Sequence, residues 1–369
     1  MLQSLLSAVY PNLRLAMSLS FTQIGLVTLV YQLTASILQP LVGLAADKHP
    51  RPFALPVGTL FTFAGLLVIS VAHNYLALLL GAAALGVGSS VFHPEASRVA
   101  RMAAAGGRHG LSQSIFQVGG NAGSALGPLA AAVVLVRWGQ ASLAFFASLA
   151  LLSTAVLFNV AQWYRRSLVH SAGRVGRPGA SITTRKARFG IAVLVMLIFS
   201  KYVYLASLTN YLTFYLIQRF NVSVPNAQIR LFSFLAAVAV GTILGGPLGD
   251  RFGRKRVIWF SIVGTVPFAL LLPHVDLQWT LALTLAIGLI LASAFPAIVV
   301  YAQELVPGRV GMISGVFFGF AFGVGGLGAA VLGQLADTDG IAAVYQICAY
   351  LPLMGVLAAF LPTAHATRK

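Results

Sequence analysis

The sequence predicts an all-α membrane protein with two parallel halves of six spans, of which the first span is incomplete. Three observations predict this fold class. Hydrophobic residues make up 58% of the 369 residues and charged residues only 8%, against about a quarter charged in a soluble domain. The apolar residues are gathered in runs long enough to cross a bilayer, and features of the first half recur in the second. A single soluble core is therefore excluded.

A spanning helix needs about 20 mainly apolar residues, and polar breaks divide the chain into eleven such runs. The first half contains Phe21–Ala46, Phe53–Ala72, Tyr75–Glu95, Leu111–Val136 and Ala141–Gln162. The second half contains Phe189–Gln218, Asn226–Leu248, Val257–Pro273, Trp279–Ala302, Val310–Leu335 and Ile341–Leu361. The fragment Leu2–Tyr10 precedes them and has about half the length that a bilayer requires. We therefore expect eleven full spans after a truncated first helix.

The basic residues define an orientation in the membrane. Of the 24 lysines and arginines, 19 lie in one set of alternate connections or at the C-terminus, whereas Arg14, Arg137, Arg219 and Arg230 lie in the other set. Cytoplasmic loops carry the excess of basic residues, so we place the larger set and the C-terminus in the cytoplasm. The formal charge of +17 therefore reflects the orientation of the chain in the membrane, and no nucleic acid partner is expected.

The longest connection divides the chain. Residues 163–188 hold seven basic residues and no acidic one, with Gly, Ser and Pro, which is typical of a flexible linker. On either side of it, Asp47 is echoed by Asp250 and Pro94 by Pro296, at offsets of 203 and 202 positions. We predict an N-terminal half at 1–162, a basic cytoplasmic linker at 163–188 and a C-terminal half at 189–369. Parallel six-span halves are one architecture of secondary transporters.

Two loops carry a recognisable motif. The stretch GPLGDRFGRK at 246–255 resembles the G-x-L-x-D-R-x-G-R-K loop of the major facilitator superfamily, and GLAADK at 43–48 is a weaker copy. The resemblance implies the fold of that superfamily, in which this loop closes the cytoplasmic side. Its glycines permit close backbone approach, and its aspartate can pair with helix N-termini and arginines. Together with nearby charges, the expected gating residues are Asp47, Arg98, Asp250, Arg251, Arg254 and Glu304.

A glycine-rich stretch lies in the span that starts at Leu111. GGNAGSALGP at 119–128 resembles the G-x3-G-x3-G-P antiporter motif of drug:proton exporters, through Gly119, Gly123, Gly127 and Pro128. Glycines four residues apart let two helix backbones touch, so generic packing is the alternative interpretation.

Longer strings narrow the resemblance. GSSVFHPEASRVAR at 88–101, FQVGGN at 116–121, FSKY at 199–202 and YAQE at 301–304 are similar to fosmidomycin resistance protein-type efflux transporters. The resemblance covers nearly the whole chain. Membership implies proton-driven efflux of a small anionic phosphonate antibiotic across a bacterial inner membrane. Members of that family begin earlier, with a complete first helix that carries polar and acidic residues.

One lysine lies inside a span. Lys201 is about 18 Å into its helix, where a cation costs at least about 2.5–3.5 kcal/mol. At helical spacing Tyr204, Tyr211 and Tyr215 share its face. An ammonium with phenolic donors suits an anion such as a phosphonate, so we predict a substrate site here. The alternative is a lysine buried against carbonyls or a partner carboxylate.

A carboxylate and an imidazole lie in the same span. Glu95 follows Pro94, which breaks the helix ladder, and His93 is close by, so we expect the pair to exchange protons. The alternative is structural: Arg98 lies one turn from Glu95 and can pair with it, and His93 is then a satisfied polar residue.

Two polar stripes complete the expected cavity lining. Gln32 belongs to one, in the second helix, and Gln117 and Asn121 belong to the other, in the fifth. We assign these three to the substrate site, although such side chains also join helices by hydrogen bonds worth about 0.6 kcal/mol.

The sequence contains no nucleotide-binding loop, metal-ligand cluster or nucleophile–histidine–acid set, and its single cysteine, Cys348, forms no disulfide framework. We therefore expect no enzyme, cofactor or metal. The expected partners are a small-molecule substrate, protons and the lipid bilayer, and we expect a monomer. Two alternatives stay open: a facilitator for another metabolite or organic anion, and a non-transporting truncated fragment.

Overall fold

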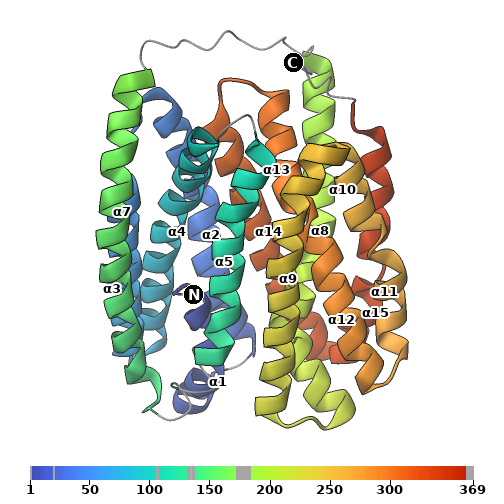
Figure 1. Ribbon diagram of the computed structural model, residues 1–369. Helices are drawn as coiled ribbons and strands as arrows, with labels where there is room; N and C mark the ends of the chain where they lie inside the picture. The colour runs from blue at the N-terminus through green and yellow to red at the C-terminus, as the bar shows by residue number, and fades with distance from the viewer. Residues whose placement is uncertain are drawn as a thin grey trace.

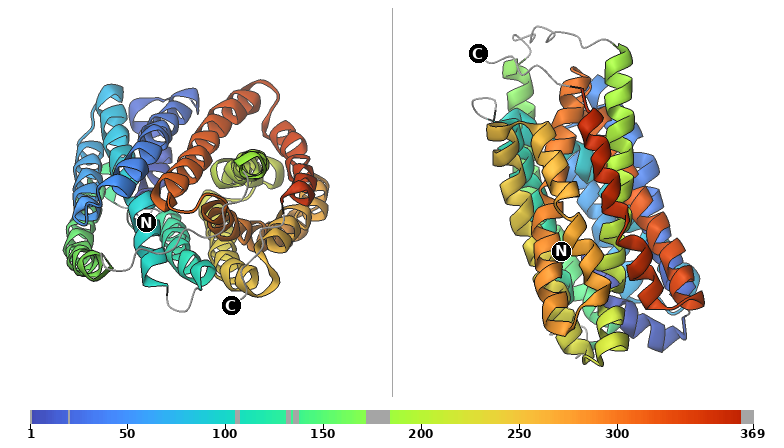
Figure 2. Two further views of the ribbon diagram at one scale, coloured as in Figure 1. Left: turned by 90° about the horizontal axis from the view of Figure 1, so that it is seen from above. Right: turned by 90° about the vertical axis from the view of Figure 1, so that its right-hand side faces the viewer.

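The computed structural model describes residues 2–19, 21–104, 108–130, 134, 138–171 and 184–362. Within these residues the chain is a bundle of helices without β-strands (Figures 1 and 2). The N-half consists of α1 (Ser4–Met17), α2 (Phe21–Lys48), α3 (Ala54–Ser70), α4 (Tyr75–Ala103), α5 (His109–Ala130), η3 (Gln140–Ser142) and α7 (Leu143–Ser171). The C-half consists of α8 (Thr184–Phe220), α9 (Val224–Phe252), α10 (Arg254–Val263), α11 (Val266–Leu271), η4 (Leu272–His274), α12 (Leu277–Ala292), α13 (Ala294–Leu305), α14 (Val310–Thr338), α15 (Ile341–Cys348) and η5 (Leu351–Phe360).

The predicted spans are helical. Nine segments of the described chain are long and apolar enough to cross a membrane. The other two predicted spans correspond to α3, with 17 residues, and α5, with 22. Because lipid offers no hydrogen-bond partners, a span must satisfy its backbone internally, as a helix does. The prediction of an all-α membrane protein is therefore confirmed.

Two spans consist of shorter helices in line. α12 and α13 meet at Ser293, three residues before Pro296, and together cover Leu277–Leu305. A proline lacks the backbone N–H and its ring crowds the carbonyl four residues earlier, which explains the interruption here. In α10, α11 and η4 the span Arg254–His274 is interrupted in the same way beside Pro267 and Pro273.

Some helix ends differ from the prediction. α1 continues past Tyr10 to Met17, because Leu13 is fully buried in the N-half core and holds the last turns in place. α7 runs to Ser171 and α8 starts at Thr184, so both helices extend into the predicted linker, where helical hydrogen bonds persist while basic side chains reach water. Residues 172–183 of that linker lie outside the described residues.

The two halves meet along few helices. α2 packs along α14, and α5 packs along α9 (Figure 2, left), while each half keeps its own hydrophobic clusters. We call the contact surface of α2, α4 and α5 with α9, α13 and α14 the seam. The end of the bundle at which α2, α4 and α9 finish, the upper end in Figure 1, is called the basic end.

Candidate functional site

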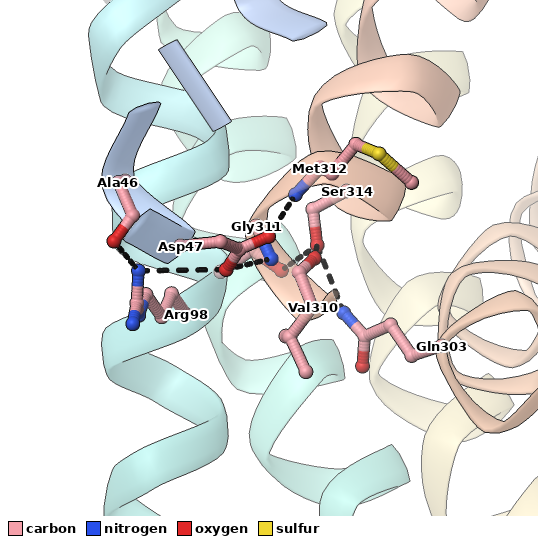
Figure 3. A network of polar contacts seen from close by, with 9 residues as sticks. Ala46, Asp47, Arg98, Gln303, Val310, Gly311, Met312 and Ser314 are labelled. Carbon is pink, nitrogen blue, oxygen red and sulfur yellow. Dashed lines mark hydrogen bonds and ion pairs between the residues drawn. The ribbon is translucent and has the colours of Figure 1, made fainter. Parts of the chain in front are cut away.

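A carboxylate at the basic end joins the two halves. Asp47, in the last turn of α2, accepts hydrogen bonds from the backbone N–H groups of Gly311 (3.0 Å) and Met312 (2.8 Å) at the start of α14 (Figure 3). These N–H groups have no partner within their own helix and form the positive end of its dipole. Arg98 of α4 lies 3.5 Å from Asp47 and also donates to the carbonyl of Ala46. The arrangement is a latch between α2 and α14.

The second copy of the motif forms a matching latch, in which the aspartate belongs to the C-half and the helix start belongs to the N-half. Asp250, in the last turn of α9, accepts from the N–H groups of Gly110 (3.2 Å) and Leu111 (3.0 Å) at the start of α5. Arg254 joins it to a further carboxylate, with distances of 3.2 Å to Asp250 and 3.0 Å to Glu304. Each half therefore presents one aspartate to the start of a helix in the other half.

The imidazole of His109 lies beside the second latch. Burial, with the guanidinium groups of Arg101 and Arg254, lowers the pKa of His109 from its ordinary value of 6.5, although the Asp250 carboxylate acts in the opposite direction. The surroundings of the latch therefore disfavour a charged His109.

Both latches depend on a glycine four residues before the aspartate. A Cβ added to Gly43 would overlap the backbone carbonyl of Gly311, and one added to Gly246 would overlap the carbonyl of Gly110. Backbone atoms cannot move aside as a flexible side chain can. The two glycines are therefore what allows α2 to touch α14, and α9 to touch α5, at the basic end.

Inside the latches lies a layer of polar side chains, formed by Ser97, Arg101, Gln113, Gln303 and Ser314. Ser97 donates to Gln113 (2.9 Å) and lies 3.2 Å from the hydroxyl of Ser314. Gln303 donates to Ser314 (2.9 Å) and accepts from Arg101 (2.7 Å). Ser97, Arg101 and Gln113 belong to the N-half, so this polar layer crosses the seam.

An aromatic layer follows toward the middle of the bundle. The ring of His93 stacks on Phe318 at 5.2 Å between centroids and meets Phe322 edge-on at 4.8 Å. Phe116 of α5 lies 6.4 Å from His93 and 6.1 Å from Phe318. Both ring nitrogens of His93 are buried without a hydrogen-bond partner. The predicted proton-exchanging residue thus lies among rings of both halves.

Lys201 lies next to this layer. Its side chain is 3% exposed, and its ammonium lies 5.3 Å from the ring centroid of Phe295 and 5.6 Å from that of Tyr202. Phe295 in turn contacts Phe318 at 5.1 Å. Within the described residues, Lys201 forms no ion pair with a carboxylate. The contacts that the described residues give this ammonium are the faces of two rings.

The tyrosines expected beside Lys201 lie elsewhere. Tyr215 stacks on Tyr345 at 4.0 Å, and Tyr204 belongs to the same hydrophobic cluster of the C-half. Tyr211 donates to the carbonyl of Ala329 in α14. The contacts of Tyr211 and Tyr215 are thus with α14 and α15.

The amide side chains that were predicted to line the substrate site lie along the seam. Gln32 lies against Gly326 of α14, and Asn121 donates to Thr242 of α9 at 2.6 Å. Gln117 is 8% exposed, and Gln32 and Gln117 each keep one buried side-chain atom without a partner. Asn121 thus joins the halves, whereas Gln32 and Gln117 retain unused hydrogen-bonding capacity.

Two charged residues of the prediction, Glu95 and Arg251, form no ion pair within the described residues. Glu95 is 2% exposed, and one of its carboxylate oxygens has no hydrogen-bond partner. Arg251 lies with its guanidinium 5.3 Å from the ring centroid of Phe252, and the structure does not bring it to either latch.

The glycines of the antiporter motif face two environments. A Cβ added to Gly119 would meet open space, whereas one added to Gly127 would overlap Ser4 of α1. Ser4 also donates to the carbonyl of Gly123 at 3.4 Å. α5 continues through Pro128 to Ala130. The later motif glycines therefore serve the contact of α5 with α1.

Several seam residues were not singled out from the sequence. The polar layer includes Arg101, Ser97, Gln303 and Ser314, and the aromatic layer includes Phe295 and Phe318. A signal was present: α4 carries seam residues at 93, 97 and 101, and α14 carries them at 314, 318 and 322. Residues four positions apart lie on one helix face. The sequence does not show which helix packs against that face, and only the fold does.

A helical bundle with two latched halves and polar groups buried between them is the architecture of a secondary transporter. The profile of the Major Facilitator Superfamily matches residues 1–229 and 197–369, and the chain belongs to that family. The fold agrees: two structures of the Escherichia coli fucose:proton symporter FucP, one in the outward conformation, give TM-scores of 0.69 and 0.67. Each is 16% identical, and each match covers 98% of both chains.

Proteins of similar sequence indicate which type of major facilitator transporter the chain is. The chain is 57% identical to the fosmidomycin resistance protein of Escherichia coli (strain K12) over 98% of its length and 89% of the relative. It is therefore a major facilitator transporter of the fosmidomycin-resistance type. It is also 40% identical to the MFS-type transporter YfnC of Bacillus subtilis (strain 168), over 100% of this chain and 91% of that one. A nitrite extrusion protein of Bacillus subtilis (strain 168) is 23% identical, over 88% and 80% respectively.

Proposed function

We propose that the chain exports a small organic anion, such as fosmidomycin, from a bacterial cell in exchange for protons. The observation that carries the proposal is Lys201, a cation buried among rings with no carboxylate partner in the described chain. Burying an uncompensated charge is costly, so an anionic ligand is the natural counterion. The 57% identical relative, a fosmidomycin resistance protein, supports the choice of drug.

The transport cycle is alternating access. The halves 1–162 and 189–369 rock against each other, with residues 163–188 connecting them. The excess of basic residues places the basic end and the C-terminus in the cytoplasm of a multi-pass inner-membrane protein, which functions as a monomer. In this conformation both latches hold the cytoplasmic side closed. Separation of the latches then opens the path on that side.

Proton exchange is assigned to Glu95 and His93. Glu95 keeps an unused carboxylate oxygen and His93 two unpartnered ring nitrogens, so both have sites that can accept a proton. His93 contacts rings of both halves, which makes its surroundings depend on whether the seam is closed. This dependence is what proton coupling requires.

A different anion is the second candidate substrate. The 23% identical relative is a nitrite extrusion protein, and a lysine binds oxyanions as a point charge without selecting one geometry. The same fold and seam serve either substrate, so a panel of anions separates the two.

Expression of the chain in a sensitive bacterium should raise the concentration of fosmidomycin that stops growth. The expected rise is at least about tenfold, since active efflux lowers the internal drug concentration well below the external one. Growth inhibition is measured against the empty vector, with the amount of protein in the membrane determined in parallel. An unchanged inhibitory concentration, despite normal membrane levels, would remove fosmidomycin as the substrate.

A further inference from the structure

Arg101 on the seam and Lys201 beside it form no ion pair with a carboxylate in the described chain. Arg98 and Arg254 are paired with carboxylates at the latches. Arg101, by contrast, gives its hydrogen bond to the neutral amide oxygen of Gln303, at 2.7 Å. Lys201 lies against the rings of Tyr202 and Phe295. The positive charges of Arg101 and Lys201 are thus not neutralised by ion pairs.

We propose that Arg101, with the hydroxyls and amides of the polar layer, forms a loading site that captures the anionic substrate at the basic end when the seam opens. The site is formed by Ser97, Arg101, Gln113, Gln303 and Ser314. Its ligand class is a small oxyanion, such as a phosphonate or carboxylate. This inference rests on the proposed function and adds to it the place where substrate first binds.

The groups whose hydrogen bonds close the polar layer become the donors of the site. When the halves separate, Arg101 loses Gln303 and Ser97 loses Ser314, because each of these contacts crosses the seam. Buried polar groups that lose their partners must find new ones. The guanidinium offers a planar fork that matches an oxyanion in two hydrogen bonds, and the hydroxyls add further donors.

The carboxylates near Arg101 form their ion pairs with another residue. Glu304 acts on Arg101 through its charge, but no ion pair joins the two in the described chain. Glu304, the neighbour of Gln303 in the chain, is held by Arg254 at 3.0 Å. Asp250 is held by the start of α5 and by Arg254. Arg254 bonds both acidic groups within the C-half, so these contacts survive opening of the seam. Glu304 and Asp250 then remain neutralised while Arg101 is released.

The loading site is connected to Lys201 by consecutive layers. On α4, Arg101, Ser97 and His93 follow one another at intervals of four residues, so they form one strip along the helix. This strip contacts Gln303, Ser314 and Phe318 in turn, and Phe318 contacts Phe295 beside Lys201. An anion entering from the basic end therefore meets Arg101 first and Lys201 last.

The test compares the two faces of the membrane. Everted vesicles offer radiolabelled fosmidomycin to the basic end, and right-side-out vesicles offer it to the opposite end. We expect Arg101→Gln to raise the half-saturating concentration at the basic end by at least about tenfold, as loss of a charge-assisted hydrogen bond implies, and to leave the opposite end unchanged. Arg101→Lys should recover most of the affinity. Arg108→Gln, which removes a cation at an exposed position of the basic end, is the matched control.

The outcomes separate the two proposals. Failure of the unsubstituted protein to move fosmidomycin in either type of vesicle would overturn the proposed function itself. Transport by the unsubstituted protein, with Arg101→Gln showing the same half-saturating concentration at the basic end, would overturn the loading site alone. Opposite changes at the two ends would also overturn it, because loss of a residue that only holds the seam closed favours one open conformation at the expense of the other.

Discussion

Replacing Lys201 with alanine should abolish export while leaving the protein in the membrane. A buried cation that binds an anionic substrate contributes about 2–5 kcal/mol when its partner is present. The loss in transport rate is therefore expected to be about 30-fold or more, since each 1.4 kcal/mol corresponds to about tenfold. Vesicle uptake of fosmidomycin measures the loss.

The fold should tolerate this change. Lys201 forms no ion pair within the described chain, and removal of a buried unpaired charge relieves a desolvation cost. Membrane levels of Lys201→Ala should match those of the unsubstituted protein. Lys201→Arg keeps the charge and should keep part of the transport, and Met196→Ala, at a position on α8 that is 45% exposed, serves as the neutral control. Undiminished transport by Lys201→Ala would exclude this residue from the mechanism.

Adding one methyl group at Gly246 should hold the basic end open. The new Cβ would overlap the backbone carbonyl of Gly110, and the Ser114 hydroxyl lies beside it. Overpacking costs about 1–3 kcal/mol, which shifts the ratio of closed to open molecules by about 5- to 150-fold. Because every cycle requires closure, transport should fall while the open conformation accumulates.

The conformational effect can be measured separately from transport. Spin labels at Met102 on α4 and Phe252 on α9, both exposed, report the separation of the halves at the basic end. Gly246→Ala should move the distance distribution to longer values. Gly249→Ala lies three residues further along the same helix, where a Cβ would make ordinary contacts at 3.7 Å, and should leave it unchanged. Equal distributions for the two variants would contradict the glycine contact.

The spans were predictable because lipid imposes a simple rule on sequence. A run of about 20 apolar residues must be helical in a bilayer, and each of the eleven predicted runs contains a helix within the residues that the structure describes. Helix ends outside the bilayer obey no such rule, which is why α1, α7 and α8 extend beyond the predicted limits. The interruption beside Pro296 was likewise not visible in hydropathy, since its cause is a missing backbone donor.

The site was predictable only in part. Charged residues in a loop motif pointed to Asp47 and Asp250, because charge at a membrane boundary is rare and conspicuous. Helical spacing did not identify the neighbours of Lys201, which are Tyr202 on the same helix and Phe295 from α13. Arg101 and Gln303 lie 202 positions apart, and no local pattern reports a contact between segments so distant in sequence.

The most direct test of the account is uptake of radiolabelled fosmidomycin by everted vesicles with an acidic interior. The account predicts accumulation above the external concentration, and loss of that accumulation when an uncoupler collapses the proton gradient. Vesicles with Lys201→Ala should remain at the level of empty vesicles. Uptake by the unsubstituted protein that stays at the level of empty vesicles, with the gradient intact, would contradict proton-coupled export of this anion.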